Sequence, residues 1–514
     1  MSRGRMRCLR PRGVQQSAAG SAGEGGMRLS KSRFTSGLQC HRRLWWEVHE
    51  PQAKELIPDE LTQAIFDQGT RVGAVARSYV PGGRLVDLPH NAYGERIALT
   101  GELLREPTPA IYEATLTAGD VYAAIDILER AGDGFNLIEV KSSTRVKDEH
   151  IPDVAVQAYI LLSNGLALKR AELMHLNPAC VYPDLSHLFK RADVSARVGA
   201  LQRELPRLIA EQLRVLAGGL PDASVGEHCA QPYACPFIDR CRGALPRYHV
   251  STLYRVKKGG EKFLASGIET IDRLPAGLKL SEIQERQRRA VTTGRLVVEP
   301  GLAGALRDFE EPIAFLDFET VAPAIPVWNG CHPYASVPAQ FSCHRLSRDG
   351  AVVHYEWLSE GPDDPRPEIA RRVAEACRDA RSIVAYNAPF ERRQLEALAD
   401  AAPELADELM AIAEKLLDLL PVVRTYVYHP DFAGSFSIKS VLPALVPGPG
   451  YEELQIAEGG VASARLERLL LRGGEMTAAE RRRAAGELRR YCALDTDGLR
   501  RLLERLRGLK PGGD

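Results

Sequence analysis

Apolar and polar positions alternate in two separate stretches of the chain, each with strands first and helices after them. In the first stretch, period-two alternation and short apolar runs predict strands, and wider apolar spacing predicts helices. The predicted strands lie at 110–116, 121–128, 135–141 and 170–176, and the predicted helices at 66–77, 150–164 and 193–216. A Gly-Asp-Gly hairpin signal at 132–134 separates the second and third strands. This order predicts a mixed α/β domain.

The pattern starts again at about residue 311. Predicted strands lie at 313–318, 339–346, 351–358 and 382–386, and predicted helices at 389–398 and 478–506. The residues in between, from about 249 to 306, predict short helices joined by turns, without recognisable catalytic residues. We therefore expect two α/β domains, at 27–245 and 309–508, joined by a helical linker at 246–308.

Composition fits this division and sets few limits on partners. A chain of 514 residues is too long for a single core. Its 67 basic and 67 acidic residues cancel, so no global field indicates a nucleic-acid partner, although acidic metal ligands and a basic groove can offset each other. No stretch approaches the roughly 20 apolar residues of a membrane span. We therefore expect a cytoplasmic protein without a membrane partner.

The first residues have a different composition from the rest. Residues 1–26 are basic and rich in Gly, Ser and Ala, and they lack the apolar core of a secretory signal. Structured sequence is predicted to begin near Met27. The segment 1–26 is therefore interpreted as a disordered leader or the product of a misassigned start codon.

The first acidic signature lies on two neighbouring predicted strands. Asp126 ends one strand, and Glu139 and Lys141 lie two residues apart on the next, hence on the same face. Oxygen ligands of this kind suit Mg²⁺ or Mn²⁺. A lysine beside them could orient the attacking water and offset charge on a phosphate. The alternative is an ordinary antiparallel sheet with surface charges.

This stretch resembles the core of the PD-(D/E)xK nucleases. The resemblance implies that Asp126 and Glu139 bind the metal and that Lys141 is catalytic. Gln157 and Tyr159 resemble the family's glutamine–tyrosine motif, with compressed spacing, and Glu113 is an additional candidate ligand. Relatives often carry a metal-binding histidine on the helix predicted at 66–77. Here that segment offers Gly73, so the resemblance leaves two outcomes: activity supported by three ligands, or activity that is weak or lost.

Four cysteines suggest an inorganic centre. Cys229, Cys235 and Cys241 follow each other with five residues between neighbours, and Cys40 lies far upstream. Disulfides are not expected in a reducing compartment, and a soft thiolate set suits zinc or an iron–sulfur cluster. The alternative is a set of unrelated buried thiols.

One cysteine before a nuclease core and three after it resembles the RecB-like nucleases, which include the CRISPR-associated exonucleases of that type. The resemblance implies a [4Fe–4S] cluster, with zinc as the second choice, that holds the ends of the domain together. The first gap between the last three cysteines is longer here than is usual in that family.

The second acidic signature is spread over three segments. Asp317 and Glu319 share one strand face, Glu391 ends an NAPFE motif, and Tyr491 and Asp495 share a helix face because they are four residues apart. These segments resemble the motifs of DEDD 3′–5′ exonucleases in their tyrosine version. The resemblance implies an RNase H-like fold, four carboxylate metal ligands and a water positioned by Tyr491. Glu391 stands where the family usually has aspartate.

The chain from Met27 onward, with PAQFS at 338–342 and IKSVLPALVP at 438–447, resembles a bacterial family whose C-terminal half is domain of unknown function 2779. We expect a metal-dependent nuclease that hydrolyses phosphodiester bonds, acting as an exonuclease on DNA with single-stranded ends in repair or defence. Two alternatives remain. One is a nucleic-acid-binding scaffold with degenerate sites, motivated by Gly73 and Glu391, and the other is an RNA-processing exonuclease.

Overall fold

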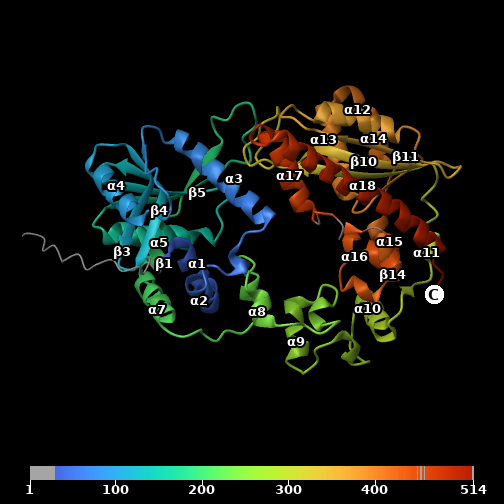
Figure 1. Ribbon diagram of the computed structural model, residues 1–514, viewed down its shortest axis with the longest axis horizontal. Coiled ribbons are helices and arrows are strands. Elements are labelled where there is room, and N and C mark those ends of the chain that lie inside the picture. Colours follow the sequence, from blue (N-terminus) through green and yellow to red (C-terminus); the bar gives the residue numbers. More distant parts are fainter. Residues whose placement is uncertain (1–28, 449, 452–453, 457, 512–514) are drawn as a thin grey trace, which may run out of the picture.

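The computed structural model describes residues 29–448, 450–451, 454–456 and 458–511, so the expected leader at 1–26 lies outside the described residues. The protein is a mixed α/β structure with a seven-stranded, a five-stranded and a two-stranded sheet. Figure 1 shows the two larger sheets in opposite parts of the molecule. We call residues 29–245 the N-terminal half, 246–308 the middle segment and 309–511 the C-terminal half.

The N-terminal half is built on the seven-stranded sheet, in the order β2-β3-β4-β5-β6-β7, with β1 pairing with β4. Its strands are β1 (Leu29–Ser30), β2 (Arg84–Leu85), β3 (Ala110–Ala118), β4 (Val121–Ala131), β5 (Gly134–Lys141), β6 (Leu168–Leu176) and β7 (Phe189–Asp193). Strands β3, β4 and β5 are antiparallel, whereas β5 and β6 are parallel because helix α5 (His150–Ser163) crosses over between them. The four central strands confirm the predicted ones.

Helices surround this sheet, and one prediction about them is wrong. The helices are α1 (Lys31–Gln39), α2 (His41–His49), α3 (Glu60–Ala76), α4 (Tyr93–Arg105), α5, α6 (Ser195–Gln202) and α7 (Leu205–Ala217). The single long helix predicted at 193–216 is instead the end of β7 followed by α6 and α7. Pro206 lies in the first turn of α7, where its missing N–H is tolerated, but it cannot continue a preceding helix.

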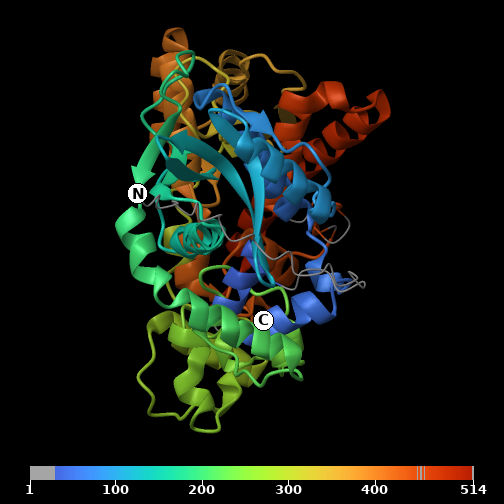
Figure 2. The same cartoon turned by 90° about the vertical axis from the view of Figure 1, so that its left-hand side faces the viewer.

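The middle segment contains the short helices that the sequence predicts. They are α9 (Glu261–Leu264), α10 (Glu282–Thr293) and α11 (Leu302–Ala305), and another short helix, α8 (Ile238–Arg242), lies just before the segment. Strand β8 (Val297–Val298) pairs with β14 (Val427–Tyr428), and Leu302 packs in the core of the C-terminal half. The end of this segment therefore packs with the C-terminal half. In the side view of Figure 2, the green-to-yellow segment lies below the blue strands.

The C-terminal half contains the five-stranded sheet, in the order β11-β10-β9-β12-β13. Its strands are β9 (Ile313–Val321), β10 (Val337–Leu346), β11 (Val352–Leu358), β12 (Ser382–Ala385) and β13 (Leu416–Asp418). Strand β10 is antiparallel to β9 and β11, and β12 is parallel to β9 and β13. The first four confirm the predicted strands, with boundaries shifted by a few residues.

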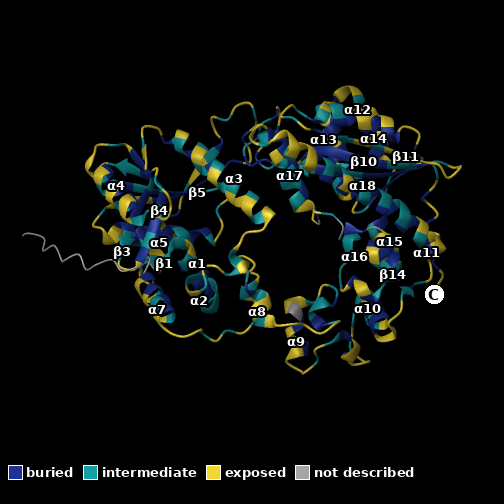
Figure 3. Ribbon diagram, in the orientation of Figure 1, coloured by how far each residue is buried: buried dark blue, intermediate teal, exposed yellow. Residues whose placement is uncertain are grey.

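Alternation along β9 assigns its two faces. Ala314, Leu316 and Phe318 pack in a core with the helices of one face, α12 (Arg366–Cys377), α13 (Pro389–Ala401) and α14 (Ala406–Glu414). Ile313 and Phe315 pack on the opposite face with α15 (Leu419–Tyr426), α16 (Ile438–Leu445), α17 (Gly459–Arg472) and α18 (Ala478–Gly508). Figure 3 shows the buried sheet residues in dark blue between these helices. Odd-numbered residues of β9 thus face α18.

The two halves meet where α3 lies beside α17. Arg71 Nη2 lies 3.2 Å from Glu467 Oε1, and Arg465 Nε lies 2.7 Å from Glu60 Oε1. An apolar cluster that includes Val72 from α3 and Ala324 from the C-terminal half supports the same contact. Within the described residues, no helix combines the length and the apolar composition that crossing a membrane requires.

Candidate functional site

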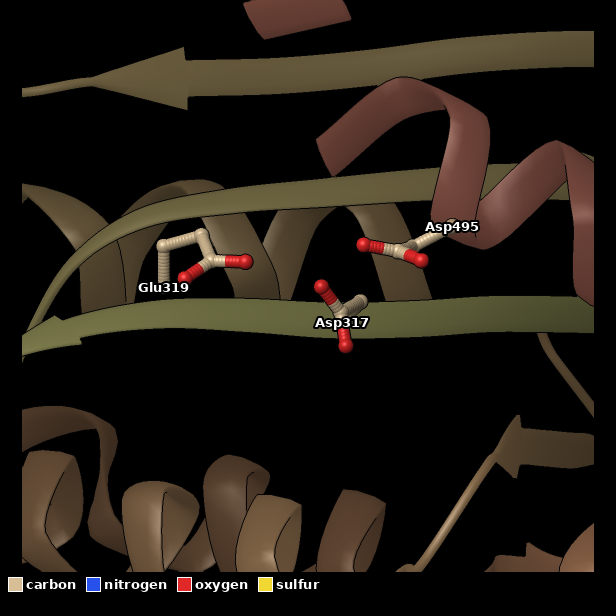
Figure 4. Close-up of side chains that lie close together, drawn as sticks. All are labelled: Asp317, Glu319 and Asp495. Atoms are coloured by element: carbon tan, nitrogen blue, oxygen red, sulfur yellow. The ribbon is translucent and has the colours of Figure 1, made fainter. Parts of the chain in front are cut away.

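The C-terminal half gathers three of the predicted carboxylates. Asp317 and Glu319 occupy odd-numbered positions of β9 and therefore face α18, which carries Asp495. One oxygen of each side chain lies within 4.8 Å of the others, and Figure 4 shows the three groups pointing toward a common space. Among the described residues, no other group of three or more His, Cys, Asp or Glu side chains has its ligand atoms this close together. We call it the carboxylate cluster.

Burial makes the negative charge of the carboxylate cluster unfavourable unless protons or a cation neutralise it. Removal from water, followed by the negative charge of its neighbours, raises the pKa of Asp317 well above its usual value and that of Glu319 to about 8. Burial also raises the pKa of Asp495 to about 6, although a hydrogen bond from Tyr451 opposes this rise. A divalent cation would satisfy these oxygens, so the donor set fits Mg²⁺ or Mn²⁺.

Glu391 lies near this cluster but outside the 4.8 Å group. It is 2 % exposed on α13, and among the described residues its Oε2 has no hydrogen-bond partner. Burial, and then the charge of Asp418, raises the pKa of Glu391 to about 8, and its own charge acts on Asp317 and Glu319. A buried carboxylate oxygen without a partner is an unmet acceptor, so Glu391 remains available to a ligand.

A turn between β12 and α13 places Glu391. Asn387 adopts a left-handed conformation with φ of 79°, which asparagine tolerates better than most residues. Its backbone N–H donates to Asp418 Oδ1 at 2.9 Å, and the same oxygen accepts from Leu420 N at 3.0 Å. Asp418 therefore joins the start of α13 to the start of α15, next to the carboxylates.

Tyr491 takes part in a network that sequence reasoning found only in part. Lys439 Nζ, from α16, donates to the Tyr491 hydroxyl at 2.8 Å and lies 4.9 Å from the centre of its ring. Tyr451 donates its hydroxyl hydrogen to Asp495. Burial, and then the charge of Asp495, raises the pKa of Tyr491. Tyr451 lies between α16 and α17, where the sequence has no periodic signal, so the sequence did not indicate it.

The raised pKa values predict that the metal-free protein loses stability as the pH rises. Glu319 and Glu391 hold protons up to about pH 8 when folded, whereas unfolded glutamate releases them near pH 4.3. Between these values the folded state binds more protons, so the free energy of unfolding falls as the pH increases. Mg²⁺ or Mn²⁺ would replace these protons. The metal-induced rise in melting temperature, measured by scanning fluorimetry, should be larger at high pH than at low pH; an equal rise would contradict the assignment.

The N-terminal half contains a second polar cluster, centred on Glu139 of β5. Lys31 Nζ, from α1, donates to both oxygens of Glu139, at 2.9 and 3.0 Å, and Lys141 Nζ lies 2.9 Å from Oε1. Gln157 Nε2 donates to Oε2 at 2.7 Å, and Lys141 also pairs with Asp153 at 2.5 Å. Burial opposes ionisation of Glu139, but the charges of Lys141 and Lys31 outweigh it and hold its pKa below the usual value.

Asp126 lies next to this group at an irregular point of the sheet. Its Oδ2 accepts the backbone N–H of Val140 at 2.7 Å, where the β4–β5 pairing ends. On the other side, Glu113 interrupts the β3–β4 pairing without changing its register and has a φ of 58°, a conformation that is rare for glutamate. Burial, and then the charge of Glu139, raises the pKa of Asp126 to about 7. Strain of this kind clusters at functional sites.

A cavity of about 490 Å³ opens onto this cluster. Its lining includes Asp126, Glu139, Lys141 and Glu113, together with Gly73 from α3. A Cβ added to Gly73 would meet nothing within 4 Å, so the helix leaves open space where relatives are expected to carry a histidine. The exposed His90 also lines this cavity. It lies in an irregular segment before α4, and no periodic pattern points to it.

The two residues expected to form the glutamine–tyrosine motif are placed differently. Gln157 is fully buried against Glu139, and among the described residues its Oε1 has no hydrogen-bond partner. Tyr159 packs with the apolar core of the N-terminal half. Two residues along an α-helix differ by about 200° in direction, so the two side chains cannot share a face. The compressed spacing therefore takes Tyr159 away from Glu139.

Lys31 was not predicted from the sequence, and its loss should have a measurable effect. Lys31→Met leaves Glu139, whose side chain is 2 % exposed, with one lysine instead of two. We expect the free energy of unfolding to fall by about 1–3 kcal/mol without metal. The loss should be smaller in Mn²⁺, because a cation can replace the missing charge. Urea denaturation tests this, with Lys169→Met, at an exposed pair with Asp133, as the control.

The structure places cysteines from both ends of the N-terminal half near one another, although among the described residues no three of their sulfur atoms all lie within 4.8 Å of one another. Cys40 lies between α1 and α2, and Cys235 N donates to Cys229 O at 2.8 Å in the loop before α8. Cys229, Cys235 and Cys241 share one cluster with Trp46. Burial raises the pKa of the Cys235 thiol, and the charges of Cys40 and Cys229 act on it in the same direction. The thiol donor set fits a soft metal centre.

Comparison with known proteins adds one match. The family described as Domain of unknown function (DUF2779) matches residues 314–437. This segment includes Asp317, Glu319 and Glu391 but ends before Tyr491 and Asp495. No curated protein matches the chain.

Proposed function

We propose that this protein is a metal-dependent nuclease that hydrolyses phosphodiester bonds, with an exonuclease site at the carboxylate cluster. The observation that carries the proposal is the convergence of Asp317, Glu319 and Asp495 from β9 and α18, with Tyr491 on the same helix face. Grouped carboxylates that hold Mg²⁺ or Mn²⁺ across a phosphate recur in nucleases, polymerases and phosphatases.

The sheet order supports an RNase H-like interpretation of the C-terminal half. A three-stranded antiparallel unit, β9, β10 and β11, is extended by β12 and β13 parallel to β9. The central strand β9 then carries the first two carboxylates, and the last long helix packs across it with the third. This is the arrangement that the resemblance to DEDD exonucleases implies.

Asp317, Glu319 and Asp495, with Glu391 beside them, would hold the cation. A bound cation would polarise the phosphate and make a coordinated water more acidic. Tyr491 stays protonated because of its raised pKa, so its hydroxyl can position that water by hydrogen bonding. Lys439 Nζ donates a hydrogen bond to the Tyr491 hydroxyl at 2.8 Å and would also attract the negatively charged substrate. Tyr451 orients Asp495.

We propose that the N-terminal half is a PD-(D/E)xK domain of the RecB-like type. Asp126 and Glu139 border the same cavity, with Lys141 on the same strand face as Glu139, as the chemistry of that family requires. Asp126 and Glu139, with Glu113 next to them, would hold the cation. Lys141 would then contact the attacking water or the phosphate.

We propose that Cys40, Cys229, Cys235 and Cys241 hold a [4Fe–4S] cluster, with zinc as the second choice. This metal centre would join the start of the N-terminal half to its end. Cys40 precedes strands β2 to β7 in the sequence, and the other three cysteines follow them. The substrate that we favour is DNA with single-stranded ends, in cytoplasmic repair or defence. RNA is the alternative polymer.

One observation favours a different role for the N-terminal half. Both oxygens of Glu139 are occupied by Lys31, which lies where a cation would compete with it. A lysine in this position suits a domain that binds nucleic acid without cleaving it. In that case cleavage would depend on the C-terminal half alone.

Cleavage of end-labelled single strands by anaerobically purified protein tests the proposal. DNA and RNA of the same sequence, labelled at either end, are incubated with Mg²⁺, Mn²⁺ or EDTA. We expect metal-dependent release of nucleotides or short oligomers from one end, preferentially from DNA. A folded, metal-binding protein that cuts neither polymer would instead support a nucleic-acid-binding scaffold.

A further inference from the structure

An exposed tyrosine is fixed beside the cysteines. The hydrogen bond from Cys235 N to Cys229 O, 2.8 Å long, closes a short loop around Tyr233. Gln39 Nε2, at the end of α1, donates to the backbone oxygens of both His228 and Tyr233 at 2.6 Å. The Tyr233 side chain is nevertheless 55 % exposed. A tyrosine whose backbone is fixed while its ring stays in solvent has the form of a contact residue, because tyrosine is enriched at interfaces.

Helix α1 connects this loop to the polar cluster around Glu139. Its first residue, Lys31, binds Glu139, and its last residue, Gln39, holds the backbone of Tyr233. Nine helical residues span only about 13 Å. Partial burial raises the pKa of Tyr233, and the charges of Lys141 and Asp153 act on the same phenol. Helix α1 therefore places the Tyr233 loop about one helix length from Lys31 and the N-terminal cluster.

We propose that Tyr233 is a stacking platform for an unpaired nucleobase of a strand bound at the N-terminal cluster. The inference rests on the proposed nucleic-acid function and deepens it by naming single-stranded nucleic acid as the ligand of this cluster. Unpaired bases offer a free π-face, whereas bases inside a duplex are already stacked on each other. Lys31 and Lys141 both contact Glu139 Oε1 at 2.9 Å, and these two cations would receive the phosphates of that strand.

The position of Tyr233 also gives the cysteines a role in substrate binding. Cys229 precedes the tyrosine by four residues and Cys235 follows it by two. A centre that ties these two cysteines to Cys40 would fix the loop against α1. The aromatic ring would then be held in place before the strand arrives, which lowers the entropic cost of binding.

The test uses a single strand with 2-aminopurine in place of adenine, bound in Ca²⁺ to slow cleavage. The fluorescence of 2-aminopurine falls when the base stacks. Full-length wild type, Tyr233→Ala, Tyr233→Phe and the control Leu245→Ala, at another exposed apolar residue, are compared. We expect quenching in all except Tyr233→Ala, which should bind about 5- to 150-fold more weakly. In an Asp317→Asn background, KM should rise while kcat changes little.

The outcomes separate the two claims. Wild-type binding and Asp126-dependent cleavage, with unchanged affinity and quenching in Tyr233→Ala, would overturn the role of Tyr233 and leave the nuclease proposal standing. A wild type that neither binds nor cuts the strand would overturn both. Equal weakening in Tyr233→Ala and Tyr233→Phe would also overturn stacking, because phenylalanine keeps the ring.

Discussion

Replacing Asp317 with asparagine is expected to reduce metal-dependent nucleotide release at the carboxylate cluster by about 1,000-fold, because the variant loses a charged metal ligand. Asparagine keeps the size of the side chain, so folding should be retained. Burial raises the pKa of Asp317 and so favours its neutral, protonated form, which a neutral amide resembles, so stability without metal should not fall. Single-turnover cleavage of an end-labelled strand in Mn²⁺ measures the loss.

The matched control is Asp497→Asn on the same helix as Asp495. Asp497 pairs with Arg500, with 2.7 Å between the carboxylate oxygen and the guanidinium nitrogen. Asp497 lies two residues from Asp495 and therefore on another face of α18. This variant should retain the wild-type rate. If Asp317→Asn cuts as fast as Asp497→Asn in an Asp126→Asn background, the carboxylate cluster is not the working site.

Replacing Cys235 with alanine is expected to remove the metal centre and to destabilise the N-terminal half by at least about 3 kcal/mol. Binding free energy of a structural metal contributes directly to folding, because the unfolded chain does not hold the ligands together. Cys235 also lies in a small cluster with Trp46 and Phe237, too small to hold the loop by apolar contacts alone. Urea unfolding and metal analysis of anaerobic protein measure both effects.

The control for this prediction is Cys377→Ala. Cys377 is fully buried between α12 and β10 in the C-terminal half, far from Cys40 along the chain. The Cys377→Ala variant loses one buried sulfur, and its free energy of unfolding should fall by about 1–2 kcal/mol. Its iron or zinc content should stay unchanged. If Cys235→Ala matches Cys377→Ala in stability and the wild type carries neither metal, the four cysteines are ordinary thiols.

The sequence predicted four strands of each large sheet, β3 to β6 and β9 to β12, from alternation or apolar runs. It did not predict β1, β2, β7 and β13, which are two to five residues long and too short for a clear period. Along β9, alternate residues pack against α12 to α14, and this period of two also predicted that Asp317 and Glu319 share a face. Spacing of four residues likewise predicted that Tyr491 and Asp495 face the same side of α18. Local periodicity was therefore enough for these four residues.

Other features depend on contacts between distant segments, which periodicity does not report. Lys31 reaches Glu139 across 108 positions of the chain, and Tyr451 reaches Asp495 from a loop. The break between α6 and α7 reflects one proline within an otherwise helical pattern. The interruption of pairing at Glu113 leaves the alternation of β3 unchanged, so the strand was predicted and its strained residue was not.

Anomalous diffraction from crystals soaked in Mn²⁺ tests the central claim most directly. The account predicts an anomalous peak among the carboxylate oxygens of Asp317, Glu319 and Asp495, lost in Asp317→Asn crystals. Protein from the same preparation should release nucleotides in Mn²⁺. Cleavage in Mn²⁺ without a peak at these three side chains would contradict the account, because the metal that supports the reaction would then be bound elsewhere.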